Sequence, residues 1–503
     1  MDNNKLVKTY EEAKKCIDNK DYNKAHELLI ILVKQNYAPA QNSLGNLYCN
    51  GFGVERNLSK AHEFWNLAAN QNYGPALRNI ALLYFHGQLF KQDIQKAIKY
   101  YQLAIKQNHA LSAYELGLLY YNGNHVEKDY SKAIEYLEIA ANQNHAKAQY
   151  VLGHIYDHCL MDYSNPEEYV TKAKKYYELA ANNNHVEACY RLAYLCSDFC
   201  ENKDWDKALK YYELAANQNH VESQYKLGTI YEFEKQDYKK AIKYYELAAN
   251  NNHDRAQLAL GNIYFLGEYV ETDYKKAIKY YELAANNNHG EAQFILGALY
   301  YTGSGVKQDL KKAIKYYELA ANNNYVEAQY ELGTLYYHGW EVAKDYTKAL
   351  KYFEIAEKRY FIHDVLEIDF FREHMNLFMF LGNMFLKGLG VNEDHKKAFE
   401  KFQIAATNGY KPACLALGTL YFNGQGVNRD YKKAFEWIKL ALESDDSNLS
   451  RDCSLIIGQM YQHGLGVKQN YKNAEKYYKI ALKYGHANAQ QLLDSIKQFL
   501  WFG

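Results

Sequence analysis

The strongest constraint on the fold is a segment of 14 residues that the chain repeats without change. KKAIKYYELAANNN stands at residues 239–252, 275–288 and 311–324, so that the copies start 36 residues apart. A fixed period of this length is typical of proteins built from stacked units, each of which needs its neighbours to bury its apolar side. The sequence therefore predicts one array of similar units rather than several unrelated globular domains.

Both halves of the repeated unit have the period of an amphipathic helix. In the third copy, Ala313, Tyr317 and Ala320 fall on one side of a helix, and Lys311 and Lys315 fall on the other. The other half follows A-x-x-x-L-G-x-[LI]-Y, whose glycine, or an alanine in its place, stands at 45, 81, 117, 153, 193, 228, 261, 297, 333, 382, 418 and 458. The pattern predicts about twelve units, each a pair of helices.

The end of the second helix is marked by residues that tolerate a left-handed backbone. One position holds asparagine or glycine in unit after unit: Asn36, Asn72, Asn108, Asn144, Asn184, Asn219, Asn252, Asn288, Asn324, Gly409 and Gly485. Asparagine and glycine share access to this conformation, which closes helices, so we expect a positive φ at each of these residues.

The complete unit resembles a known repeat. LG-x-[LI]-Y is followed by G-x-G-V-x-x-D, as at Gly303-Ser-Gly305-Val, then by KA-x-x-[YFW] and a turn. This order resembles the Sel-1-like repeat (SLR), a relative of the tetratricopeptide repeat, over roughly residues 20–500. The resemblance implies an all-α protein, a right-handed superhelical α-solenoid of about twelve helix-turn-helix repeats. It also implies a scaffold or adaptor that binds other proteins or peptides.

The repeats suggest five segments. We expect an N-terminal helical cap (1–37), about nine repeats (38–356), an apolar insertion (357–377), about three further repeats (378–485) and a C-terminal capping helix (486–503). The insertion is too apolar for a solvated linker. Two interpretations stay open, an extra helix or lengthened turn packed on the solenoid, and a docking or dimerisation surface formed by Phe361, Ile362, Leu366, Phe370 and Phe371.

Composition and charge exclude several classes. Lys and Arg total 59, as do Asp and Glu, so no net charge draws the chain to nucleic acid or an anionic membrane. No secretory signal or membrane-spanning stretch is visible, and eight irregularly placed cysteines form no disulfide framework. We expect a cytoplasmic protein without membrane attachment; its oligomeric state is not predicted.

No motif predicts catalysis or a cofactor. The G-x-G-V segments lack the third glycine of a dinucleotide fingerprint and follow helices rather than strands. A motif copied in every unit also supplies no singular constellation of reactive groups. We therefore predict a non-enzyme that binds no cofactor.

A zinc site is the minor alternative near residues 154–200. Two histidines one helical turn apart lie close in sequence to four cysteines: His154, His158, Cys159, Cys189, Cys196 and Cys200. Cys196, however, aligns with a tyrosine expected in the core of other units, which favours a buried thiol, and we predict no metal ligand. Seven further histidines share one position with tyrosines and are expected to pack beside the turn: His109, His145, His185, His220, His253, His289 and His486.

The resemblance to tetratricopeptide solenoids implies that first helices line a concave groove. Positions two residues before and one residue after the recurring glycine vary along the chain, and they supply the candidate groove residues Asn46, Asn79, Glu115, His154, Arg191, Tyr194, Lys226, Asn262, Glu331 and Asn383. Their mixed chemistry suits an extended or helical polypeptide. Unconstrained exposure to solvent explains the variation equally well.

Nucleic-acid binding is the competing hypothesis from another class. The identical second helices repeat lysines at 239, 275 and 311 and at 243, 279 and 315, with tyrosines nearby. Glutamates at 246, 282 and 318 offset the second row, and the tyrosines are expected in the core, so nucleic acid is not the favoured partner.

Overall fold

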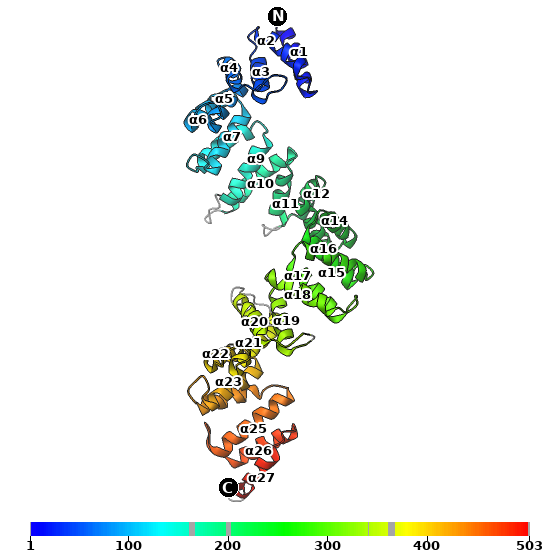
Figure 1. Ribbon diagram of the computed structural model, residues 1–503, viewed down its shortest axis with the longest axis vertical. Helices are drawn as coiled ribbons and strands as arrows, with labels where there is room; N and C mark the ends of the chain where they lie inside the picture. Colours follow the sequence, from blue (N-terminus) through cyan, green and yellow to red (C-terminus); the bar gives the residue numbers. More distant parts are fainter. Residues whose placement is uncertain (1, 160–165, 198–202, 341, 361–367, 501–503) are drawn as a thin grey trace. The chain divides into compact units, whose positions relative to one another are not determined.

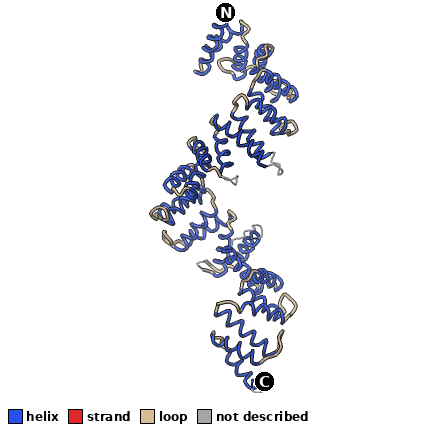
Figure 2. Tube along the Cα trace, turned by 180° about the vertical axis from the view of Figure 1, so that it is seen from behind, coloured by secondary structure: helices blue, strands red, loops and turns tan. Residues whose placement is uncertain are grey.

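The computed structural model describes residues 2–159, 166–197, 203–340, 342–360 and 368–500. Within these residues the chain is built of helices joined by turns, and no strand is present (Figures 1 and 2). It divides into two compact units, Met1–Ala248 and Ala249–Gly503.

The helices of the first unit alternate in pairs, with two short π-helical segments labelled η. They are α1 (Asn3–Asp18), α2 (Tyr22–Val33), α3 (Ala38–Asn50), α4 (Leu58–Ala69), α5 (Gly74–His86), α6 (Ile94–Lys106), α7 (Ala110–Asn122), α8 (Tyr130–Ala141), α9 (Ala146–His154), η1 (Ile155–Cys159), α10 (Pro166–Asn182), α11 (Val186–Ser197), α12 (Trp205–Ala216), α13 (Val221–Thr229), η2 (Ile230–Glu234) and α14 (Tyr238–Asn250).

The second unit continues the same alternation. Its helices are α15 (Asp254–Leu266), α16 (Tyr274–Asn286), α17 (Gly290–Thr302), α18 (Leu310–Asn322), α19 (Val326–His338), α20 (Tyr346–Tyr360), α21 (Ile368–Lys387), α22 (His395–Thr407), α23 (Lys411–Asn423), α24 (Tyr431–Ala441), α25 (Ser447–His463), α26 (Tyr471–Lys483) and α27 (Ala489–Leu500). Odd-numbered helices from α3 to α25 are the first helices of the pairs, except that η1 and η2 follow α9 and α13. The predicted α-solenoid of about twelve helix pairs is confirmed.

The recurring glycine lies where the two helices of a pair touch. A Cβ added to Gly297 would stand 2.5 Å from Cδ1 of Tyr317, a ring that is 4% exposed. A Cβ at Gly153 would meet Tyr177 at the same distance, and one at Gly333 would meet Phe353 at 2.4 Å. The absence of a side chain therefore lets the ring of the second helix pack directly on the backbone of the first helix.

The predicted left-handed turns are present. The nine asparagines from Asn36 to Asn324 have φ between 56° and 68°, and Gly409 and Gly485 have φ of 83°. The turn residue is thus chosen for its backbone, since few other side chains tolerate this conformation.

A buried glutamine on the first helix connects consecutive pairs. Nε2 of Gln293 donates to the carbonyl oxygen of Ala285 at 2.9 Å, and its Oε1 accepts from Nδ2 of Asn323 at 2.8 Å. The same bonds recur for Gln149 with Ala141 and Asn183, and for Gln257 with Ala249 and Asn287. One side chain therefore joins the second helices of two consecutive pairs and fixes their spacing.

The expected insertion interrupts this glutamine series. Gln329 is 1% exposed and donates to the carbonyl oxygen of Ala321 at 3.1 Å, but its Oε1 has no partner among the described residues. The sequence has Arg359 where the asparagine of the other pairs would stand. Residues 357–360 extend α20, residues 368–377 lengthen the first helix α21, and Phe361, Ile362 and Leu366 lie outside the described residues.

We predict that a single methyl group at Gly297 weakens the pair α17/α18. Gly297→Ala should be less stable than Gly290→Ala by about 1–3 kcal/mol, because the methyl group added at residue 297 enters a filled core and the one added at residue 290 does not. At Gly290 the nearest atom to the added Cβ is 3.5 Å away, an ordinary contact. Urea unfolding and hydrogen exchange in α17 and α18 measure the difference; equal stabilities would show that the glycine contact is not needed.

Candidate functional site: the first-helix face

The ten candidate residues occupy two positions, one on each side of the recurring glycine. Because that glycine faces the second helix, its flanking positions lie at the border of the buried surface. All ten side chains are half-buried: Asn46, Asn79, Glu115, His154, Arg191, Tyr194, Lys226, Asn262, Glu331 and Asn383. We call this set the first-helix face.

Asn46 and Asn79 are brought together in one network. Oδ1 of Asn46 accepts from Nε1 of Trp65 at 3.0 Å and from Nδ2 of Asn79 at 3.0 Å. Nδ2 of Asn79 also donates to Oδ1 of Asn42 at 2.9 Å. These bonds hold α5 to the pair α3/α4, so both asparagines act in packing between repeats as well as lining the face.

Glu115 forms an ion pair between consecutive first helices. Its carboxylate accepts from both Nε and a terminal nitrogen of Arg78 on α5. Arg78 was not among the predicted site residues. The signal for it was an arginine at a position where other units have aromatic or aliphatic side chains, such as Tyr114 and Leu258.

His154 lies beside a buried carboxylate. Its Nδ1 is 3.0 Å from the hydroxyl of Tyr121, and its ring centre is 4.6 Å from that of His158. Burial, and next the charge of His158, lower the pKa of His154. Asp157, in η1, accepts from the hydroxyl of Tyr177 at 3.1 Å and lies 3.2 Å from Nε2 of His158.

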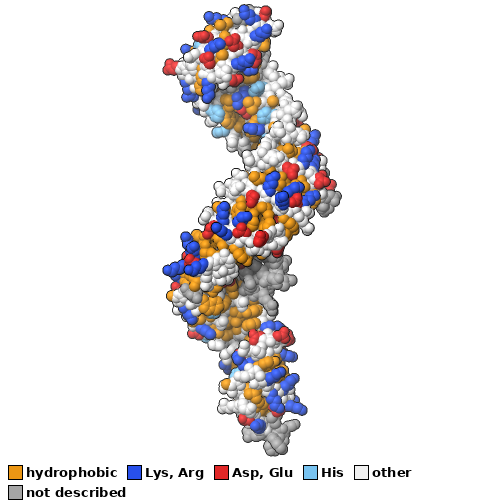
Figure 3. Space-filling model, turned by 90° about the vertical axis from the view of Figure 1, so that its right-hand side faces the viewer, with side chains coloured by type: hydrophobic (Ala, Val, Ile, Leu, Met, Phe, Trp, Pro, Cys, Tyr) orange, Lys and Arg blue, Asp and Glu red, His pale blue; other side chains and the backbone are white. Residues whose placement is uncertain are grey.

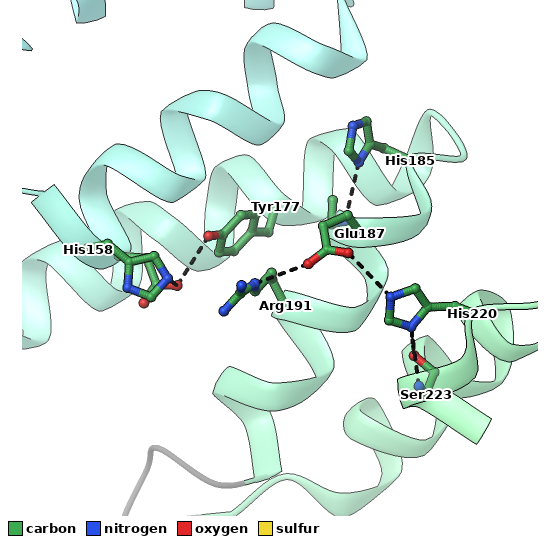
Figure 4. Close-up of polar contacts among 9 residues, drawn as sticks. His158, Tyr177, His185, Glu187, Arg191, His220 and Ser223 are labelled. Atoms are coloured by element: carbon green, nitrogen blue, oxygen red, sulfur yellow. Dashed lines mark hydrogen bonds and ion pairs between the residues drawn. The ribbon is translucent and has the colours of Figure 1, made fainter. Parts of the chain in front are cut away.

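Arg191 belongs to a polar chain that connects α11 with α13. Figure 4 shows Glu187 between Arg191 and His220, at 3.3 Å from Nε of the arginine and 3.3 Å from Nε2 of the histidine. Nδ1 of His220 accepts from the backbone N–H of Ser223 at 3.2 Å, so Nε2 carries the proton and donates to Glu187. The hydrogen bond from His220 lowers the pKa of Glu187.

The remaining candidates make separate contacts. Nζ of Lys226 lies 5.7 Å from the ring centre of Tyr194, which joins α13 to α11. In the second unit, Oδ1 of Asn262 accepts from the hydroxyl of Tyr281 at 2.8 Å. Glu331 and Asn383 lie on α19 and α21.

An aromatic cluster of α19, α20 and α21 lies next to the first-helix face of the second unit and was not predicted. Phe380 stacks on Phe353 at 5.2 Å between ring centres and lies 5.6 Å from His338. His338 in turn stacks on Trp340 at 4.2 Å, and Trp340 is 51% exposed. Of the expected docking residues, Phe370 and Phe371 fall within the backbone of α21 and their side chains are not described.

The zinc hypothesis gains no support from the described residues. Among them, no three histidine, cysteine, aspartate or glutamate side chains are grouped as metal ligands. Cys189 and Cys196 are 1% and 3% exposed and belong to the buried side of α11. The side chain of Cys159 and all of Cys200 lie outside the described residues.

The recurring histidines begin first helices. Nδ1 accepts from a backbone N–H three residues later, at 3.2–3.4 Å, in His109, His145, His185, His220, His253 and His289. The tyrosines at this position make no such bond, and three are followed by proline within two residues, which leaves fewer N–H groups without a partner. The expected packing role is joined by helix capping.

The helix pairs, their turns and the face between them define a helical-repeat solenoid. A family model described as Sel1 repeat matches residues 38–73, 74–109, 110–145, 146–185, 186–220, 221–253, 254–289, 290–325, 326–359, 379–410, 411–446 and 455–486. The chain belongs to the Sel1 repeat family. Among its described residues, no helix is both long and apolar enough to cross a bilayer.

One solved structure has the same fold. The chain is similar to a protective antigen present in uropathogenic Escherichia coli strains that displays an SLR fold, with 25% identity, a TM-score of 0.58 and coverage of 94% of this chain and 97% of that chain. It is also similar to a Sel1 repeat protein from Oxalobacter formigenes, with 24% identity, a TM-score of 0.35 and coverage of 72% and 91%. No curated protein matches the chain.

We predict that the capping histidines make stability depend on pH. Burial lowers the pKa of His109, His145 and His185. The unfolded chain therefore binds more protons below about pH 6.5, and stability falls as the pH drops through that value.

A triple His→Asn variant at 109, 145 and 185 keeps capping side chains that do not titrate. Three of the six histidines with lowered pKa are then gone, so the loss of urea midpoint between pH 7.5 and 5.5 should shrink by about half. An unchanged loss would assign the pH dependence to other groups.

Proposed function

We propose that the chain is a non-catalytic scaffold whose first-helix face binds polypeptides. The observation that carries this is a contrast between neighbouring positions. Leu192 and Leu332 are fully buried in equivalent places, whereas the half-exposed residues beside them are Arg191 in one unit and Glu331 in the other. The packing stays constant while the accessible chemistry changes, which fits a surface that distinguishes partners.

The chemistry of the first-helix face supports a polypeptide partner. Amides predominate at Asn46 and Asn79, a charged and aromatic stretch follows at Arg191 and Tyr194, and the second unit adds the exposed ring of Trp340. Arginine and aromatic side chains contribute most of the energy at many protein interfaces. A uniformly charged polyanion would not match a surface whose chemistry changes from repeat to repeat.

The nucleic-acid alternative is weakened by the tyrosines. Tyr281 and Tyr317 are 2% and 4% exposed, and the neighbouring Tyr280 and Tyr316 stack on tyrosines of their own first helices at 6.0 and 5.8 Å. These rings are therefore occupied and do not offer a free surface to bases. Near the N-terminal end of Figure 3, Lys and Arg are interspersed with Asp and Glu, and on the identical second helices Glu246, Glu282 and Glu318 stand among the repeated lysines, so neither surface has a single sign of charge.

A reducing compartment fits the cysteines. Cys16, Cys189, Cys196, Cys414 and Cys453 are buried and free of disulfide bonds, as is the half-buried Cys49. We infer that the scaffold works in the cytoplasm, since thiols persist there.

The test is affinity capture from a lysate of the producing cells, read by mass spectrometry, with and without nuclease. The wild-type chain should retain a small set of polypeptides after nuclease treatment. A double variant, Tyr194→Ala with Lys226→Glu, should lose at least one of them, whereas Lys279→Glu on the second helix α16 should retain all. Capture that disappears with nuclease, or that resists the first-helix variant, would overturn the proposal.

A further inference from the structure

The second helices carry an apolar position that the fold leaves exposed in seven pairs and half-buried in five. Six residues after the buried alanine of each second helix, the side chain is leucine or isoleucine in every pair: Leu67, Leu103, Ile139, Leu179, Leu214, Leu247, Leu283, Leu319, Ile355, Ile404, Leu440 and Ile480. Leu67, Leu103 and Leu179 are 46%, 44% and 38% exposed. Such a regular apolar row on a surface marks a contact with another macromolecule.

In the first unit this row crosses a hollow between α6 and α8. The hollow has a volume of about 580 Å³, and Leu103, Ile105 and Ile139 contribute its apolar lining. Lys99 and Glu135 stand on opposite walls, on α6 and α8 respectively. The surface is therefore apolar in the middle and oppositely charged on its two sides.

The charges beside this hollow alternate in sign. Two residues after the buried alanine, α4 has Glu63, α6 has Lys99, α8 has Glu135 and α10 has Lys175. All four side chains are exposed, and within the described part of the chain no ion pair involves any of them. Their order is self-complementary, because exchanging α6 with α8 and α4 with α10 places each charge opposite the other sign.

We propose that a second copy of this chain covers the α4–α10 face. The two copies are related by a two-fold axis that runs parallel to the second helices and passes between α6 and α8. That rotation places α6 against α8 of the partner copy. Equivalent positions of the two helices then lie at the same height along the helix axes. Lys99 then meets Glu135 of the partner copy, and Leu103 meets Ile139 of the partner copy, each contact occurring twice.

The outer helices also pair residues of opposite charge across the two-fold axis. The axis brings α4 over α10 of the partner copy, so Glu63 faces Lys175 of the partner copy. One step further out, Glu27 on α2 corresponds to Lys210 on α12, which is again a pair of opposite sign. Pairs of opposite charge thus extend over three helices on each side of the axis.

Two lysines that would face each other across the two-fold axis are each bound within their own chain. Lys96 and Lys132 occupy equivalent positions on α6 and α8, but each forms an ion pair with the aspartate that caps its helix, at 3.6 and 3.1 Å. Their ammonium groups also lie 5.3 and 5.2 Å from the ring centres of Tyr84 and Tyr120 on first helices. These charges are neutralised within one chain and do not repel across the axis.

The face is large enough for a stable contact. Four helices of roughly 18 Å length, spaced about 9–10 Å apart, present about 600–700 Å² per copy, close to the ~800 Å² per partner of a standard interface. The chain carries no net charge, so long-range repulsion does not separate the copies.

Charge reversal in the full-length chain tests the geometry, with molar mass measured by sedimentation equilibrium at low and high ionic strength. The wild type should form a dimer by the time its concentration reaches about 100 µM. K99E and E135K, each alone, should weaken self-association at least about tenfold, because two attractive contacts become repulsive in each dimer. Lys279→Glu, at the equivalent position of α16 outside this face, should leave the dimer intact.

Mixing the two charge-reversed variants is the decisive experiment. Equimolar K99E and E135K should form a mixed dimer, since each reversed charge then meets its opposite, and the double variant K99E/E135K should dimerise with itself. Circular dichroism confirms that every variant is folded. A monomeric wild type, a dimer indifferent to K99E, or single variants that fail to associate on mixing would each overturn the proposal.

Discussion

The structure depends on the close contact between the first-helix glycine and a large side chain of the second helix. At Gly153 and Gly297 the rings of Tyr177 and Tyr317 lie so near that one added methyl group would overlap them, whereas Ala81 and Ala193 stand at this position in two other pairs. This contact sets the distance within a pair, and the glutamine bonds to two consecutive second helices set the distance between pairs. Both are repeated, so one local geometry fixes a long chain of helices.

The fold was predictable because its determinants are local. A period of 36 residues, a helical pattern of apolar positions and a residue able to adopt positive φ each act within one unit. The bonds of Gln293 were not predictable, because a glutamine in an apolar pattern carries no sign of what it will reach. The capping by His145 was likewise missed, since histidine is not among the preferred capping residues.

That the candidate residues line a binding groove stays a prediction. The structure shows Asn46, Asn79 and Glu115 half-exposed on their first helices. What the sequence could not show is that these side chains bond to other repeats, because such bonds join residues more than 30 positions apart. A residue chosen for partner recognition can therefore also hold its neighbour in place, and its substitution affects both.

Two repeats, 146–185 and 221–253, place a carboxylate beside the buried tyrosine of the second helix. The carboxylate stands four residues after the first-helix glycine: Tyr177 bonds to Asp157, and Tyr245 bonds to Glu232 at 2.6 Å, whereas Tyr281 of a regular repeat bonds to Asn262 next to the glycine. Both acceptors lie in π-helical segments, which follow the first helix directly. Burial raises the pKa of Glu232.

Where a phenylalanine replaces the tyrosine, no hydroxyl needs an acceptor and no carboxylate stands four residues after the glycine. Phe353 is matched by Tyr337 at that position, and Phe402 by Leu386. A buried hydroxyl without a partner would be costly, so each buried tyrosine needs an acceptor within reach. The carboxylates of Asp157 and Glu232 thus follow from placing a tyrosine where a ring meets a glycine. They serve the packing of their own repeats, and the proposed recognition of partners rests instead on the half-exposed residues beside the glycine.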